Sequence, residues 1–167
     1  MATATYVPLA TQTLGSATNT ITFSSIPSGY TDLRLVSSTV ASATTNSFAV
    51  RINADSGANY SNTWLYGAGA TAGSMYSTSI TRLTINPGLV SPSTSYPYLV
   101  TIDFMSYLST SAYKSILFTH SMDENGSGDI TLGVGLWRST SAITSITCFT
   151  DGGPNWNAGS TFTLWGI

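Results

Sequence analysis

The stretch Leu136–Ile167, LWRSTSAITSITCFTDGGPNWNAGSTFTLWGI, decides the fold of this chain. Apolar residues alternate with Thr or Ser in its first part, around Ile146 and Cys148, and again in its last part, around Phe162 and Leu164. Alternation with a period of two is typical of a strand that has one face in a core and one in water. The stretch therefore predicts two β-strands.

Turn-forming residues separate the two predicted strands. Residues 151–154 are Asp-Gly-Gly-Pro, and residues 157–159 are Asn-Ala-Gly. Gly adopts positive φ without steric cost, and Pro fixes φ while removing a hydrogen-bond donor, so both segments favour turns. We expect a hairpin here. Because the sequence ends on the strand-like residues 164–167, Leu-Trp-Gly-Ile, we also expect the last strand to be paired inside a sheet.

Five short motifs are distributed over residues 29–167. They are G-Y-T-D-L-R-L from Gly29, N-A-D-S-G-A-N-Y-S from Asn53, W-R-S-T-S-A-I from Trp137, G-S-T from Gly159 and L-W-G-I from Leu164. In this order they resemble a group of small virion proteins of tailed bacteriophages, whose C-terminal signature is W-x-S-T-x-A-I, then G-S-T, then L-Y-G-I. Trp165 stands where Tyr is usual in that group.

The resemblance implies a place in a phage particle. The group includes capsid decoration proteins, also called cement proteins, as well as tail and fibre proteins, and none of the motifs is catalytic. The resemblance implies a location in the virion after synthesis in the cytoplasm of the bacterial host. We expect the major capsid protein or another virion protein as partner, and assembly as a homotrimer.

The composition favours a single all-β domain. A chain of 167 residues and 17.5 kDa suits one domain with its own core. Only 7% of the residues are charged, against roughly 25% in ordinary soluble domains. The 27 Thr and 26 Ser must therefore provide most of the polar surface, and Thr, which is β-branched, suits the outer face of a strand.

The charge pattern argues against nucleic-acid and membrane partners. The net charge is −2, and the basic residues stand singly along the chain rather than in a patch that could bind phosphates. No apolar run approaches the roughly 20 residues of a membrane span, and the first residues lack the pattern of a signal peptide. Cys148 is the only cysteine, which excludes an intrachain disulfide, and we expect it to be a small buried hydrophobe.

The spacing of apolar runs and turn residues predicts an antiparallel β-sandwich, with a jelly roll preferred and an immunoglobulin-type sandwich as second choice. We expect residues 1–18 to form an N-terminal arm or edge strand, and residues 19–167 to form one sandwich domain. Exposed loops are expected at residues 39–47 and 86–95. The predicted strands are residues 20–23, 32–40, 47–53, 63–66, 79–85, 98–107, 113–121, 130–137, 143–149 and 161–165.

Three groups of residues are candidates for catalytic or metal chemistry. His120 is the only histidine, and the sequence contains no nucleophile motif such as G-x-S-x-G, so we expect a structural or interface role. Asp123, Glu124 and Asp129 flank a Gly-rich segment, interpreted as a solvated hairpin loop with a weak Ca²⁺ site as the alternative. Residues 53–59 lack the closing Glu of an EF-hand loop and are interpreted as a turn held by Asx side chains. No catalytic residue, metal ligand or cofactor is predicted.

Aromatic residues provide the candidate interface. Tyr60, Trp64 and Tyr66 follow one turn, and Trp156 lies between two Asn residues beside a Gly-Pro pair. Such rings pack in a core, anchor a protein partner or stack on sugars. We predict Trp156 as the main interface anchor, so that its replacement by Ala weakens assembly and leaves the monomer folded.

Two hypotheses of function follow. The first is a non-enzymatic virion structural protein, a trimeric cement protein that stabilises the capsid surface. The second is a receptor-binding or carbohydrate-binding module on the tail or a head fibre, which predicts an exposed Trp or Tyr in a groove with polar partners. Copy number separates them, because a cement protein is present in many copies per particle.

Overall fold

The computed structural model describes residues 5–43, 47–86, 88 and 93–167. These residues form strands, turns and bends, and none belongs to a helix that could cross a membrane. The strands are β1 (Val7–Thr13), β2 (Thr20–Phe23), β3 (Leu33–Thr39), β4 (Ser47–Ile52), β5 (Tyr60–Ala68), β6 (Thr71–Ile80), β7 (Leu83–Thr84), β8 (Tyr98–Phe104), β9 (Lys114–Met122), β10 (Asp129–Trp137), β11 (Ile146–Asp151) and β12 (Thr161–Gly166).

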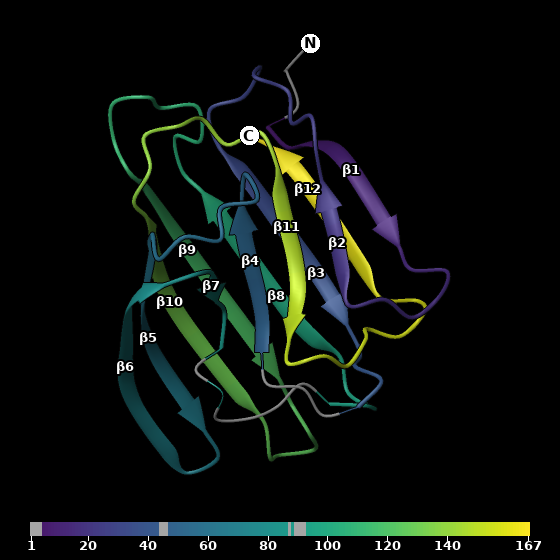
Figure 1. Cartoon of the computed structure of the whole chain (residues 1–167). Coiled ribbons are helices and arrows are strands. Elements are labelled where there is room, and N and C mark those ends of the chain that lie inside the picture. The colour runs from purple at the N-terminus through teal and green to yellow at the C-terminus, as the bar shows by residue number, and fades with distance from the viewer. Residues whose placement is uncertain (1–4, 44–46, 87, 89–92) are drawn as a thin grey trace.

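Two antiparallel sheets pack against each other, so the predicted all-β sandwich is confirmed (Figure 1). The larger sheet has eight strands in the order β1-β12-β3-β8-β9-β10-β5-β6. The smaller sheet has four strands in the order β2-β11-β4-β7. The more detailed expectation of a jelly roll stays a prediction. Within the predicted exposed loops at 39–47 and 86–95, residues 44–46, 87 and 89–92 lie outside the described residues; Ser42 and Gly88 are exposed as expected, whereas Ala41 and Asn86 are buried.

One hydrophobic core lies between the two sheets. Leu35, Ile102 and Phe118 face it from the larger sheet, and Val50 and Cys148 face it from the smaller one, each at most 1% exposed. Burial raises the pKa of the Cys148 thiol. The prediction of a buried, hydrophobe-like cysteine is therefore confirmed.

Both terminal strands belong to the larger sheet. β1 forms one edge and pairs with β12, so within residues 5–18 the structure shows the edge strand rather than the free arm. Pro8 lies in this edge strand, next to an irregularity in the pairing between Pro8 and Ala10, as expected for a residue without an N–H group. β12 lies between β1 and β3, which confirms that the last strand is paired inside the sheet.

The hairpin predicted for residues 143–165 is wrong. β11 pairs with β2 and β4 in the smaller sheet, whereas β12 pairs with β1 and β3 in the larger one. The turn chemistry is as expected, since Gly152, Gly153 and Gly159 all have positive φ. These turns carry the chain from one sheet to the other, and Trp156 makes isolated bridges to Thr18 and Ala41 on the way.

In β10 three large apolar side chains face outward, towards water, where polar side chains are usual. Ile130, Leu132 and Val134 point away from the smaller sheet and are 46% to 62% exposed. The inward positions include two glycines, because neighbouring side chains occupy their space. A Cβ on Gly133 would lie 2.2 Å from the Phe118 ring, and one on Gly135 would lie 2.5 Å from Leu83.

Candidate interaction surface

Six exposed apolar side chains lie together on the outer face of the larger sheet. β8, β9, β10 and β5 are hydrogen-bonded neighbours there (Figure 1). Leu132 is opposite Leu65 in the register, and Val134 is opposite Leu117. We call the six residues the outer apolar surface: Leu65, Leu99, Leu117, Ile130, Leu132 and Val134.

Hydroxyl groups rather than charges surround the outer apolar surface. Thr63, Thr119 and Ser121 are its in-register neighbours on β5 and β9. The carboxylate of Asp103, opposite Leu117, is held by the guanidinium of Arg34, with N–O distances of 2.6 and 2.8 Å. Two shallow hollows, of about 360 and 220 Å³, lie between the apolar rows.

Trp156, the predicted interface anchor, is a core residue, so that prediction is wrong. Its side chain is 2% exposed. Its ring centroid lies 5.3 Å from that of Phe48 and 4.7 Å from that of Phe162. The connection between β11 and β12 folds back between the sheets and places the indole inside, which the flanking Asn and Gly residues do not reveal.

Tyr60 and Trp64 are also in the core, so neither is an exposed anchor. The Tyr60 hydroxyl accepts a hydrogen bond from the Ile52 amide at 3.1 Å and donates one to the Asp55 carbonyl at 3.0 Å. Burial raises the pKa of Tyr60 to about 12. Both rings point inward from β5. Tyr66 is partly exposed, with its ring over Gly73, and its role at an interface stays a prediction.

His120 lies inside the sandwich, a position that fits the structural role expected of it. Its Nε2 atom is 3.0 Å from Oδ2 of Asp129, and both side chains are at most 1% exposed. Its ring stacks on Tyr98, with centroids 4.7 Å apart. Burial, and then the negative charge of Asp129, raise the pKa of Tyr98 well above its ordinary value. The three residues join β8, β9 and β10.

The carboxylates around the Gly-rich segment differ in exposure: Asp123 is exposed and Asp129 is buried. Asp123 lies in the exposed turn between β9 and β10, where its Oδ1 atom accepts a hydrogen bond from the Gly126 amide at 2.7 Å. Asp129 instead points inward to His120. The hairpin-loop interpretation therefore holds for Asp123 and is wrong for Asp129, which is a buried residue of β10. Within the described parts of the chain, no group of three or more His, Cys, Asp or Glu residues could hold a metal ion.

Residues 53–59 form the expected turn with Asx hydrogen bonds. Oδ1 of Asp55 accepts from the Gly57 amide at 2.8 Å, and Oδ2 accepts from Nε1 of Trp137 at 2.7 Å. Burial raises the pKa of Asp55, but hydrogen bonds from Trp137, Asn59 and the Gly57 amide outweigh it and hold the pKa below its ordinary value. Through the hydrogen bond to Trp137, this turn holds the C-terminal end of β10 in place.

The motifs of the phage resemblance meet in pairs in the structure. Residues 53–61 contact residues 137–143, through Asp55 to Trp137 and through Nδ2 of Asn53, which donates to the Ala142 carbonyl at 2.7 Å. The amide of Arg138 also donates to the Asn59 carbonyl at 2.8 Å. This pair of motifs positions the chain between β10 and β11.

The other pair joins residues 29–35 to the last four residues. The amides of Thr31 and Asp32 donate to the Ile167 carbonyl at 2.8 and 3.2 Å, and the Ile167 amide donates back to the Asp32 carbonyl at 3.0 Å. The ring of Tyr30 covers Gly166. The motif residues named here therefore make contacts that stabilise the fold. None of the motif residues belongs to the outer apolar surface.

A small cleft opens beside β7, where the smaller sheet ends and the larger one continues to β5 and β6. Its volume is about 280 Å³. Trp64 lines it but is only 3% exposed, and its Nε1 atom donates to the Thr84 carbonyl at 3.1 Å. Trp64 does not offer the exposed ring that the carbohydrate hypothesis predicts.

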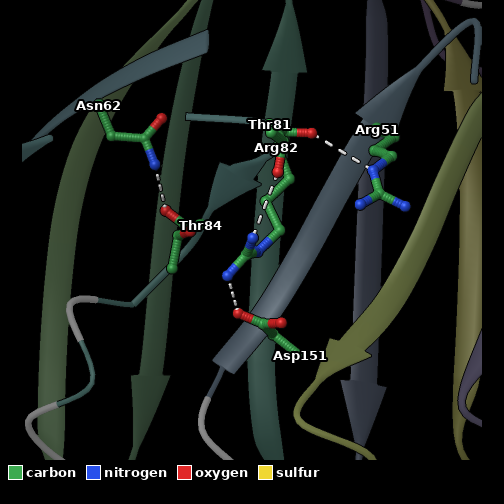
Figure 2. A network of polar contacts seen from close by, with 6 residues as sticks. All are labelled: Arg51, Asn62, Thr81, Arg82, Thr84 and Asp151. Carbon is green, nitrogen blue, oxygen red and sulfur yellow. Dashed lines mark hydrogen bonds and ion pairs between the residues drawn. The ribbon is translucent and has the colours of Figure 1, made fainter. Parts of the chain in front are cut away.

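Polar contacts around this cleft tie the two sheets together. Asn62 of β5 donates to the Thr84 carbonyl at 2.7 Å, and Arg82 pairs with Asp151 of β11. The short segment that contains β7 is thus attached on both sides. Figure 2 shows these contacts among Arg51, Asn62, Thr81, Arg82, Thr84 and Asp151.

Comparisons with protein-family models, with curated proteins and with solved structures find no match.

Proposed function

We propose that the chain is a non-enzymatic structural protein of a bacteriophage particle, a decoration protein that stabilises the capsid surface. The observation that carries the proposal is the contrast between the two faces of the larger sheet. Its inner face holds His120 and Asp129 in the core, and its outer face exposes an uncharged apolar surface. An exposed apolar surface of this kind marks an interaction site.

The mechanism is stabilisation by binding. A protein that binds the assembled capsid and not the free subunits shifts the equilibrium towards the assembled lattice. Linked copies add effective concentration, because the second and third contacts become intramolecular. The resemblance supports this role, and the structural use of its motifs leaves the outer surface for contacts with other proteins.

The test is the number of copies in purified particles produced by bacteria that carry the gene. Quantitative mass spectrometry gives the ratio of this protein to the major capsid protein, with an abundant cytosolic host protein as the contamination control. The proposal predicts tens to hundreds of copies per particle. A handful of copies would favour the tail or fibre hypothesis, and a level equal to that of the host control would refute a virion role.

A further inference from the structure

We propose that four side chains on the inner face of the larger sheet form an internal binding site for ordered water. We call them the inner polar cluster: Tyr98, His120, Asp129 and Thr131. Each of these residues is at most 5% exposed. The site is independent of the proposed function, because it lies in the core and not on the outer apolar surface.

The register of the larger sheet brings the inner polar cluster together. His120 of β9 is directly opposite Thr131 of β10. Asp129 is two residues before Thr131, on the same side of β10, and its Oδ2 atom lies 3.0 Å from Nε2 of His120. The ring of Tyr98, from β8, stacks on the imidazole with centroids 4.7 Å apart. Polar groups from three adjacent strands therefore meet inside the sandwich.

The polar atoms of the cluster lack hydrogen-bond partners among the described residues. This holds for both ring nitrogens of His120, both carboxylate oxygens of Asp129 and the hydroxyls of Tyr98 and Thr131. The contact between His120 and Asp129 is short, but it does not have the alignment of a hydrogen bond. Roughly 90% or more of buried polar groups in proteins bond to protein or to ordered water. Six such atoms in one place indicate a shared partner other than a side chain.

The chemistry of the six atoms selects water as that partner. The two hydroxyls can donate hydrogen bonds, whereas the carboxylate of Asp129 accepts them. Burial, and then the negative charge of Asp129, raise the pKa of Tyr98, so its hydroxyl keeps the proton that it donates. Water donates and accepts, and a buried water typically makes about 2 to 4 hydrogen bonds to such groups.

A metal ion fits the inner polar cluster less well than water. A metal ion uses only lone pairs, and typical protein sites supply about three or four strong ligands. Here His120 and Asp129 are the only strong ligands of the cluster. Within the described residues, no group of three or more His, Cys, Asp or Glu residues is placed to hold a metal. The cluster therefore matches a ligand that both donates and accepts hydrogen bonds.

A hollow beside the cluster provides a route to solvent. Asp129 lines an open hollow of about 460 Å³, together with Gly67, Gly69 and Gly128. These glycines add no side chains that would close it. At Gly128 a side chain is excluded, because a Cβ there would lie 1.9 Å from the carbonyl oxygen of Met122. Asp129 thus belongs to both the cluster and the hollow, through which water can exchange.

The direct test is a high-resolution crystal structure of the full-length protein. It should show electron density for at least one water within about 2.7 to 3.2 Å of polar atoms from two or more of the four side chains. An ion at metal–ligand distances of about 2.0 to 2.2 Å would overturn the inference. So would side chains that hydrogen-bond one another directly, with no water among them.

The variant Thr131→Val gives a second test, in solution. Valine keeps the shape of threonine and removes the hydroxyl. If that hydroxyl binds a bridging water, its loss should lower the thermal unfolding midpoint by about 2 to 4 °C. If the hydroxyl had no partner, its removal would leave the midpoint unchanged or raise it, which would overturn the inference. Thr119→Val, at an exposed position on the outer face of β9, is the matched control and should not lower the midpoint.

Discussion

The ring of Tyr30 lies directly over the backbone of Gly166, so closely that a Cβ on Gly166 would be 2.5 Å from two ring carbons. This contact joins the loop before β3 to the end of β12. Gly166→Ala should therefore destabilise the fold by about 1 to 3 kcal/mol, the usual cost of forcing an extra carbon into a packed site. Chemical denaturation measures it.

Gly15→Ala is the control for that substitution, because nothing lies within 4 Å of a Cβ there. It should be neutral or slightly stabilising. Equal effects of the two substitutions would contradict the packing of Tyr30 on Gly166.

Replacing Trp156 should unfold the chain rather than only weaken its assembly. The indole packs between Phe48 and Phe162, so Trp156→Ala should cost about 3 to 5 kcal/mol. Tyr76→Thr, at a side chain that is 76% exposed on β6, should change stability by no more than about 0.5 kcal/mol. A Trp156→Ala protein with wild-type unfolding would restore this residue as an interface anchor.

The buried pair of His120 and Asp129 should show strong coupling. Removing one partner leaves the other buried polar side chain unsatisfied and costs about 1 to 3 kcal/mol, so His120→Leu and Asp129→Leu should each be destabilising. The double variant should lose less than the sum of the two single losses. Additive losses in a double-mutant cycle would show that the two side chains do not interact.

Acid should weaken the fold through Asp55. Its pKa is lower in the folded chain than in the unfolded one, so the folded state favours the ionised carboxylate. This stabilisation is complete above the unfolded pKa of about 3.9 and is lost as the pH falls through the folded-state pKa. Asp55→Asn should cost about 1 to 3 kcal/mol at neutral pH, and its stability should converge with that of the wild type in acid.

The matched control for Asp55 is Asp123→Asn, in the exposed turn between β9 and β10, where Asn can accept the same hydrogen bond from the Gly126 amide. It should leave the free energy of unfolding at neutral pH within about 0.5 kcal/mol of the wild type. If Asp55→Asn also leaves it unchanged, the hydrogen bonds to Asp55 do not stabilise the fold in the way described here.

Local patterns in the sequence predict most of the strands but not how they pair. Most of the predicted ranges coincide with observed strands within a few residues, because alternation and turn residues act locally. β6 is the main strand that the pattern does not predict, since its residues are partly or fully exposed and its sequence does not alternate. The hairpin error has the same origin: turn chemistry at residues 151–159 is local, whereas the choice of sheet is made by partners far along the chain.

The candidate surface could not be found from the sequence for a similar reason. Alternating Ile130, Leu132 and Val134 predict a strand with these residues in the core. In the structure the rings and side chains of Phe118 and Leu83 occupy the space above Gly133 and Gly135, which turns the apolar side of β10 outward. Only contacts between distant residues decide which side faces the core. The same limit placed Trp156 at the surface in the sequence-based prediction.

An image reconstruction of the intact particle, with this protein located by a label, tests the central claim most directly. The account predicts density on the capsid surface at the three-fold positions. Density at the tail, or particles without this protein, would contradict the decoration role.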